Sequence, residues 1–189
     1  MINHKSFCYN VSGDKMKIVI ASDIHGNLEY AKKLYEFCEK KDPDKIILLG
    51  DLLNNYYHSD YFEIDEIVSL MNRFSAITIA VKGNTDRIDD IEKLNFQVSS
   101  IYDEIDIDGV KFYLTHGHYL DKYDYLFADN YCLTGHTHRY NLEGKHLNPG
   151  SVGLPRYNKE HTFLLYENGE FTLINLDDYS VIAKKTLYK

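Results

Sequence analysis

The sequence has little of several features that mark particular classes of protein. It contains no tryptophan, only three prolines and only three cysteines, and 29 acidic residues outnumber 21 lysines and arginines. Three cysteines without paired spacing argue against a disulfide framework and favour a reducing compartment. We therefore expect a cytoplasmic protein.

Long apolar stretches are also missing. No run approaches the roughly 20 residues that a helix needs to cross a bilayer, and residues 1–15 lack the apolar centre of a secretory signal. The net charge of −8 argues against the broad basic surface that binds a nucleic-acid duplex. We expect neither a membrane nor a duplex as partner. An acidic protein that handled phosphates would need local positive charge, which bound cations could supply.

What remains is the composition of one globular domain. The 189 residues are 44% hydrophobic and 26% charged, which is enough to bury a sizeable core. The first convincing strand begins at Met16. We therefore expect residues 1–15 to form a poorly ordered N-terminal extension, and residues 16–189 to form the domain. The sequence leaves the oligomeric state open, including a homo-oligomer.

The pattern of apolar residues changes halfway along the chain. Its first half alternates apolar, β-branched runs with segments of helical periodicity, and its second half contains hairpin signals. Two mixed sheets packed face to face with helices outside would satisfy this pattern, so we predict an α/β fold. The predicted strands are 17–23, 45–51, 76–84, 131–136 and 180–187, the predicted helices are 28–41, 62–74 and 86–94, and the predicted hairpins are 104–117, 140–150 and 162–176.

Five apolar runs end in polar residues whose side chains can bind metal or phosphate. In α/β folds, functional groups collect just beyond the carboxyl ends of neighbouring strands. We therefore expect these side chains to meet at one site. They are Asp23 and His25 after the first run, Asp51 after the second, Asn84 after the third, His116 and His118 after the fourth, and His136 and His138 after the fifth.

Imidazole nitrogens together with carboxylate oxygens suit divalent cations of borderline softness. Manganese is the foremost candidate, with zinc, iron, nickel and cobalt as alternatives. Six or more ligands exceed the four that a single zinc takes, so two metals that share Asp51 fit the count better. Each residue alone has a simpler explanation, because an Asp or Asn after a strand is often a cap or turn residue. Chance placement of all of them at strand ends is improbable.

The motifs as a set resemble those of calcineurin-like metallophosphoesterases. Their spacing and the small domain are most similar to the compact bacterial and archaeal phosphodiesterases, the YfcE-like branch. The resemblance extends from Met16 to the final strand. The motifs that carry it are, in order, "SDIHGN", "GDLLN", "GNTD", "THGH", "GHTH" and "NPGS".

This resemblance implies a four-layer α/β/β/α sandwich and a dinuclear metal centre whose bridging hydroxide attacks phosphorus. It implies a hydrolase of small phosphodiesters, in which Asp51 and Asn84 take part in catalysis and Asn84 contacts substrate. His118 is a further candidate for catalysis and substrate contact, and a supporting or a surface role for it stays open. One metal would be held by Asp23, His25, Asp51 and His138, and the other by Asp51, Asn84, His116 and His136.

One position departs from the family pattern. Many relatives have a histidine after the asparagine of the third motif, where it helps to protonate the leaving group, but this chain has Thr85. A threonine hydroxyl is a poor general acid. We expect slow turnover of esters with poor leaving groups, unless His118 or a water supplies the proton. The compact phosphodiesterases also tend to lack this histidine.

Two alternative functions stay open from the sequence. A phosphomonoesterase or nucleotide pyrophosphatase of the same fold would use the same ligands. A non-catalytic scaffold is the other, since a subunit of the retromer coat resembles these enzymes. The intact set of metal ligands favours an enzyme.

Overall fold

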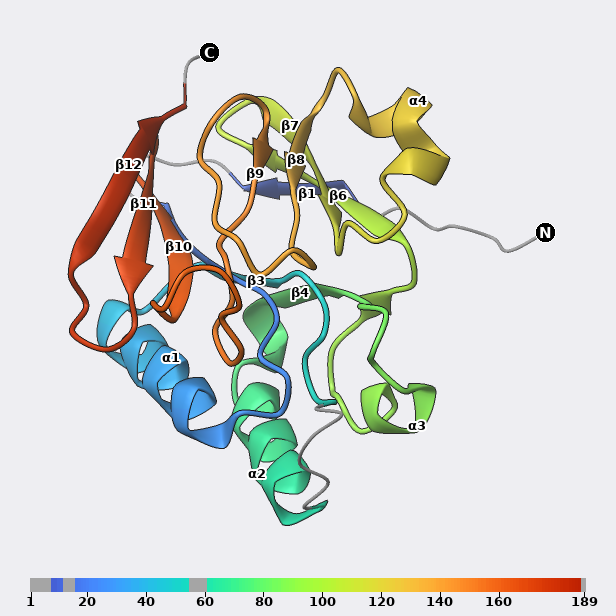
Figure 1. Ribbon diagram of the computed structural model, residues 1–189, viewed down its shortest axis with the longest axis vertical. Coiled ribbons are helices and arrows are strands. Elements are labelled where there is room, and N and C mark those ends of the chain that lie inside the picture. The colour runs from blue at the N-terminus through green and yellow to red at the C-terminus, as the bar shows by residue number, and fades with distance from the viewer. Residues whose placement is uncertain (1–7, 12–15, 55–60, 188–189) are drawn as a thin grey trace.

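The computed structural model describes residues 8–11, 16–54 and 61–187, and within them two mixed sheets pack face to face (Figure 1). The larger sheet has seven strands in the order β12-β11-β10-β2-β3-β4-β5. Its central strands β2, β3 and β4 are parallel neighbours, so their carboxyl ends lie at one edge. The bounds are β2 (Lys17–Ala21), β3 (Lys45–Leu48), β4 (Thr78–Val81), β5 (Val98–Ser99), β10 (Thr162–Glu167), β11 (Glu170–Asn175) and β12 (Val181–Thr186).

The smaller sheet has five strands in the order β1-β6-β7-β8-β9. The antiparallel pair β6 and β7 turns at Asp108-Gly109, and β8 lies parallel to β7. The polar residues after β7 and β8 therefore leave the sheet at the same edge. The bounds are β1 (Cys8–Val11), β6 (Tyr102–Ile107), β7 (Val110–Thr115), β8 (Tyr131–Leu133) and β9 (His146–Leu147).

Helices cover the outer faces of the two sheets. The helices α1 (Leu28–Lys41) and α2 (Tyr61–Asn72) lie side by side on the larger sheet (Figure 1). The short helix α4 (Asp124–Phe127) covers the smaller sheet, where Phe127 packs on side chains of β7 and β8. The short helix α3 (Ile88–Ile91) follows β4. The order helix, sheet, sheet, helix confirms the predicted α/β/β/α sandwich.

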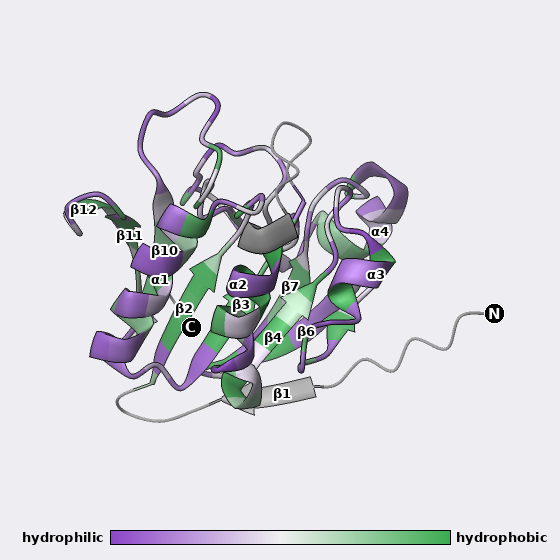
Figure 2. Cartoon of the chain, turned by 90° about the horizontal axis from the view of Figure 1, so that it is seen from below, coloured by the Kyte–Doolittle hydropathy of each residue, from purple (hydrophilic) through white to green (hydrophobic). Residues whose placement is uncertain are grey.

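Besides the small cluster of Phe127 under α4, two large apolar cores hold these layers together. One lies between the helices and the larger sheet, and the other lies between the two sheets. Figure 2 shows hydrophobic residues along β2, β4 and β7 and hydrophilic residues on the outer surface of α1. Within the described part of the chain, no helix combines the length and the apolar character required to cross a membrane.

The structure departs from the sequence prediction in two segments. Residues 8–11 of the expected extension form β1, which pairs in parallel with β6 and so continues the smaller sheet. The remaining residues of that segment lie outside the described part. The predicted hairpin 140–150 is reduced to one antiparallel bridge between Asn141 and Asn148, because β9 pairs in parallel with β8 instead.

Candidate metal centre

The loops that follow β2 and β3 are joined by backbone hydrogen bonds. The N–H of Asp23 donates to the carbonyl of Gly50 over 3.0 Å, and the N–H of His25 donates to the carbonyl of Asp51 over 2.9 Å. A loop of the other sheet joins them, because the N–H of His136 donates to Oδ2 of Asp23 over 3.0 Å. The two sheets therefore bring their loops to one common site, as the positions after the strands predicted.

One buried group at this site consists of Asp23, His25 and His138. The two Nε2 atoms of the histidines lie 3.2 Å apart, and Oδ1 of Asp23 lies 3.6 Å from His25 Nε2 and 3.3 Å from His138 Nε2. Among the described residues this oxygen has no hydrogen-bond partner, although it is buried. A cation between the three atoms would satisfy the oxygen and both nitrogens.

A second buried group combines Asp51 and His116 with Asp23. Oδ2 of Asp51 lies 3.3 Å from Nε2 of His116 and 3.6 Å from Nε2 of His25. Asp51 thus lies between a histidine of each group, a position that suits a carboxylate shared by two cations. Oδ1 of Asn84 lies 3.1 Å from Nε2 of His116, on the more exposed side of this group.

The three buried imidazoles are oriented as metal ligands usually are. In each ring Nδ1 lies against a backbone carbonyl, which fixes a proton there and leaves the lone pair of Nε2 pointing into the site. Imidazole nitrogens and carboxylate oxygens in this arrangement fit a divalent cation of borderline softness. The acceptor carbonyls are those of Asn54 for His25, at 3.0 Å, of Leu49 for His116, at 2.7 Å, and of Leu154 for His138.

His136 and His118 lie at the rim of the site. The exposed ring of His136 has its centroid 5.1 Å from that of His116, but its nitrogens are not part of either buried group. His118 lies 6.0 Å from His136 and 4.0 Å from Tyr119, measured between ring centroids. Its Nδ1 is buried and has no hydrogen-bond partner among the described residues. All eight side chains predicted from the sequence thus lie in one region. Six of them have a polar atom within 3.6 Å of another member of the set, namely Asp23, His25, Asp51, Asn84, His116 and His138.

Electrostatics set the charge of two of these groups. Burial raises the pKa of Asp51, but the adjacent His116 ring and the N–H of Thr85 more than offset it and hold the pKa below its usual range. Burial lowers the pKa of His118 to about 4, and the neighbouring His116 and His136 add to this shift. At neutral pH Asp51 is therefore ionised and His118 is neutral. A neutral imidazole is poorly suited to donate a proton as a general acid.

Backbone strain is concentrated at the site. Left-handed backbone conformations cost most residues other than glycine roughly 1–2 kcal/mol, and they persist where the surrounding structure imposes them. Such strain at functional positions indicates that side-chain placement is maintained at the expense of stability. The affected ligand candidates are Asp23, His25, Asp51, His136 and His138, with φ between 50° and 68°.

Asp86 holds two loops of the site together. Its carboxylate accepts hydrogen bonds from the N–H of Gly83 at 2.8 Å and from those of Leu52 and Leu53 at 2.7 and 3.3 Å. In the sequence Asp86 stands out only as the last residue of the "GNTD" motif. The short spacing from Asn84 to Asp86 could have indicated this role, because a tight turn over these residues brings the carboxylate back to the N–H of Gly83.

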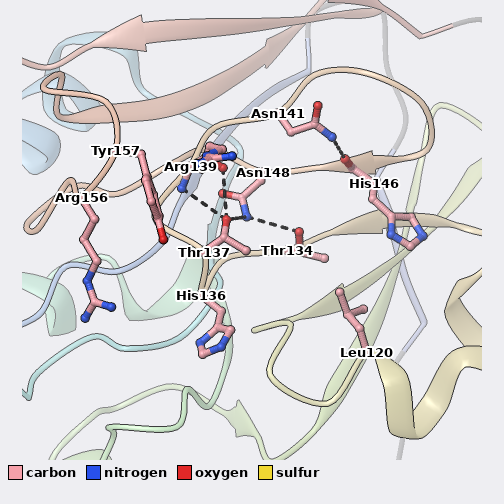
Figure 3. A pocket seen from close by; sticks show the side chains of 10 residues that line it. All are labelled: Leu120, Thr134, His136, Thr137, Arg139, Asn141, His146, Asn148, Arg156 and Tyr157. Atoms are coloured by element: carbon pink, nitrogen blue, oxygen red, sulfur yellow. Dashed lines mark hydrogen bonds between the residues drawn. The ribbon is translucent and has the colours of Figure 1, made fainter.

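A pocket of about 560 Å³ adjoins this site and shares His136 with it (Figure 3). Arg139 and Arg156 line it, and the guanidinium of Arg139 lies 4.2 Å from the ring centroid of Tyr157. Arg156 was not singled out in the sequence, because its loop is brought to His136 only by the fold.

The order and geometry of these groups agree with a comparison of the sequence with known families. Residues 16–170 match the calcineurin-like phosphoesterase superfamily domain. The chain belongs to this superfamily. It is therefore a phosphoesterase, and the divalent metals that the superfamily implies match the aspartate and histidine groups described above.

Individual relatives of this phosphoesterase are also known. Phosphodiesterase YfcE of Escherichia coli is 28% identical over 178 residues, which cover 89% of this chain and 97% of YfcE. A phosphodiesterase of Methanocaldococcus jannaschii is 28% identical over 134 residues, which cover 65% of this chain and 74% of that protein. The solved structure of YfcE, described as a phosphoesterase, matches 92% of this chain and all of YfcE with a TM-score of 0.78. These similarities confirm the YfcE-like branch and its fold.

Proposed function

We propose that this phosphoesterase hydrolyses small phosphodiesters with two divalent cations held at the joined loops. The observation that carries the proposal is the convergence of three Nε2 lone pairs on two buried carboxylates. Each of these rings is oriented by a backbone carbonyl behind it, and one carboxylate oxygen has no partner among the described residues. Burial lowers the pKa of His25 and of His116, but the neighbouring carboxylates more than offset it, so without cations a proton would occupy the place that a metal takes.

The proposed ligands follow the two buried groups. Asp51 would be shared, since it lies between His25 and His116. His136 would complete the second set by a rotation of its exposed side chain. The first cation would be held by Asp23, His25, Asp51 and His138, and the second by Asp51, Asn84, His116 and His136.

A bound pair of divalent cations, with manganese foremost, would neutralise phosphate oxygens and acidify a water molecule. The chain's own side chains would do the rest. The amide of Asn84 is exposed and can donate to a phosphoryl oxygen while its Oδ1 faces His116. His118, neutral at pH 7, would contact the substrate at the rim, and Asp51 would stay ionised throughout.

Thr85 supports a diester with a good leaving group as the substrate. The position beside Asn84 offers a hydroxyl rather than an imidazole, so the chain does not supply a strong acid there. The E. coli and M. jannaschii relatives are both named phosphodiesterases. We therefore favour diesters over phosphomonoesters and over pyrophosphates.

The test compares two esters of one phenol. Protein stripped with a chelator and reloaded with manganese should release p-nitrophenol faster from bis(p-nitrophenyl) phosphate than from p-nitrophenyl phosphate. Asp51→Asn should lower kcat/KM by more than the roughly 10–100-fold typical of residues that only support a ligand. Asp65→Asn, at an exposed position of α2, is the matched control and should leave the rate unchanged. Faster monoester turnover would refute the diester assignment, and no turnover with any metal would refute the proposed activity.

A further inference from the structure

Two arginines, Arg139 and Arg156, line the pocket beside His136 in a protein of net charge −8. In Figure 3 the guanidinium of Arg156 and the imidazole of His136 extend to the same side of the pocket. Arg156 lines the same pocket as His136 and therefore lies beside the metal centre.

Neither arginine of the pocket forms an ion pair with another described residue. Among the residues that the structure describes, no carboxylate lies within ion-pair distance of Arg139 or Arg156, whereas Arg73 pairs with Glu39. Arg139 is held by the face of Tyr157 instead. A cation stacked on an aromatic ring keeps its N–H groups available for hydrogen bonds in its own plane.

The two side-chain amides of the pocket already have partners. The amide of Asn148 donates to the carbonyl of Gly135 over 2.8 Å, and its oxygen accepts from the N–H of Gly150 over 2.8 Å. The amide of Asn141 likewise donates to the backbone carbonyls of Glu143 and His146. The guanidinium groups are therefore the strong donors that remain for a ligand.

We propose that Arg139 and Arg156 select substrates whose second ester arm ends in an oxyanion, either a carboxylate or a phosphate. This inference rests on the proposed phosphodiesterase activity. A diester bound at the metal centre has one leaving arm and one arm that stays attached to phosphorus. The pocket adjoins His136, so it can receive the second arm, and two planar guanidinium groups match the geometry of an oxyanion.

Charge favours this assignment over a neutral or cationic arm. The two guanidiniums and the cations proposed at the metal centre would repel a quaternary ammonium group. Stacking of an uncharged ring on Tyr157 is less favoured, because Arg139 already occupies one face of that ring. Tyr157 thus acts as a positioning residue for Arg139.

The experiment uses p-nitrophenyl phosphodiesters that differ only in the second arm. The arm ends in a carboxylate, in the methyl ester of that carboxylate, in a phosphate or in a trimethylammonium group. For the manganese-loaded protein we expect kcat/KM to be roughly tenfold higher for the carboxylate than for its methyl ester, with most of the difference in KM. The phosphate arm should rank with the carboxylate, and the trimethylammonium arm should rank last. The preference should shrink as salt rises from about 20 to 500 mM.

Variants then assign the preference to the pocket. Arg139→Gln and Arg156→Gln should each reduce the ratio of carboxylate to methyl ester, whereas Arg73→Gln, which removes the same charge beyond α2, should leave the ratio as in the wild type. Tyr157→Leu should reduce the ratio. Tyr157→Phe should keep the wild-type ratio, because the ring face that Arg139 contacts remains.

The outcomes separate this inference from the proposed function. Hydrolysis of the methyl ester with no preference for an anionic arm, or equal losses on all arms in the arginine variants, would overturn the inference and leave the diesterase activity standing. A preference for an arm with an uncharged aromatic ring, abolished by Tyr157→Leu, would also overturn it in favour of stacking. Failure to hydrolyse any of the esters would overturn the proposed function as well.

Discussion

Thr85 links the chemistry of the site to a single side chain. Its N–H donates to Oδ1 of Asp51 over 2.8 Å, so its backbone helps to orient the carboxylate that we propose to be shared. Its side chain is buried, and its Oγ1 has no hydrogen-bond partner among the described residues. The backbone at this position thus serves the metal centre, whereas the buried side chain offers no imidazole to protonate a leaving group.

Substitution of this threonine should change turnover according to the leaving group. We expect Thr85→His to raise kcat on diesters with poor, alkyl leaving groups by roughly 10-fold or more, because a positioned imidazole can donate the proton that the departing alkoxide needs. Diesters of p-nitrophenol should gain little, since that leaving group departs without a proton. Steady-state kinetics on the two ester types measure the difference.

Thr85→Val is the control for size and shape at this position. It keeps the branched side chain but cannot transfer a proton, so it should not raise kcat on either ester type. If Thr85→His keeps its full metal content and still gives no gain on alkyl esters, our account of this position is contradicted.

The residues of the site differ in how far the sequence reveals them. The seven ligand candidates could be predicted because each follows an apolar run, and parallel strands align the ends of such runs. The supporting role of Asp86 depends on a loop that turns back on itself, and the place of Arg156 depends on a long loop after β9. Arg156 has no fixed spacing from a strand end, so only the fold brings it to the site, whereas the short spacing from Asn84 could have indicated Asp86.

The loops of the site approach one another so closely that they require glycine at particular positions. A Cβ atom on Gly135, which follows β8, would lie 1.8 Å from Oγ of Ser22 and 2.9 Å from Oδ2 of Asp23. Ser22 itself donates to that carboxylate oxygen over 2.6 Å. The loops after β2 and β8 are therefore fitted to each other at Asp23.

Enlarging this glycine should separate the two loops. We expect Gly135→Ala to lower the free energy of unfolding by roughly 2–3 kcal/mol, as overpacking of a tight contact does, and to weaken metal binding by displacing Asp23. Denaturant titration and metal titration measure the two effects.

The atom that lies nearest to the added Cβ, Oγ of Ser22, suggests a second substitution that should partly restore stability. Ser22→Ala removes the nearest atom, so the double variant Ser22→Ala, Gly135→Ala should be more stable than Gly135→Ala alone. If Gly135→Ala were as stable as the wild type with unchanged metal affinity, the close fit of the loops would not matter for the site.

Elements with strong local signals could be predicted and those set by distant pairing could not. The helix 28–41 has the predicted bounds, because Asn27 caps its first turn and Asp42-Pro43 ends it. The turns at Asp108-Gly109 and Asn168-Gly169 likewise formed hairpins. The segment 140–150 has a similar turn signal, but β9 pairs with β8, a partner that no local pattern specifies.

With the proposed cations bound, the whole molecule would combine a positively charged site with an acidic surface. The two sheets present their loops at one edge, where the proposed cations and two arginines would concentrate positive charge while the net charge of −8 keeps other surfaces unattractive to anions. Attraction of phosphate esters would then be local. The proposed cations are thus the component on which the proposed chemistry depends.

The most direct test of this account is anomalous diffraction from a crystal grown with excess manganese. The account predicts two anomalous peaks roughly 3.5–4 Å apart, one beside Asp23, His25 and His138 and the other beside His116 and Asn84, with Asp51 between them. The same crystal from Asp51→Asn protein should lose at least one peak. A wild-type crystal with no peak at these side chains, although manganese is abundant, would contradict the central claim.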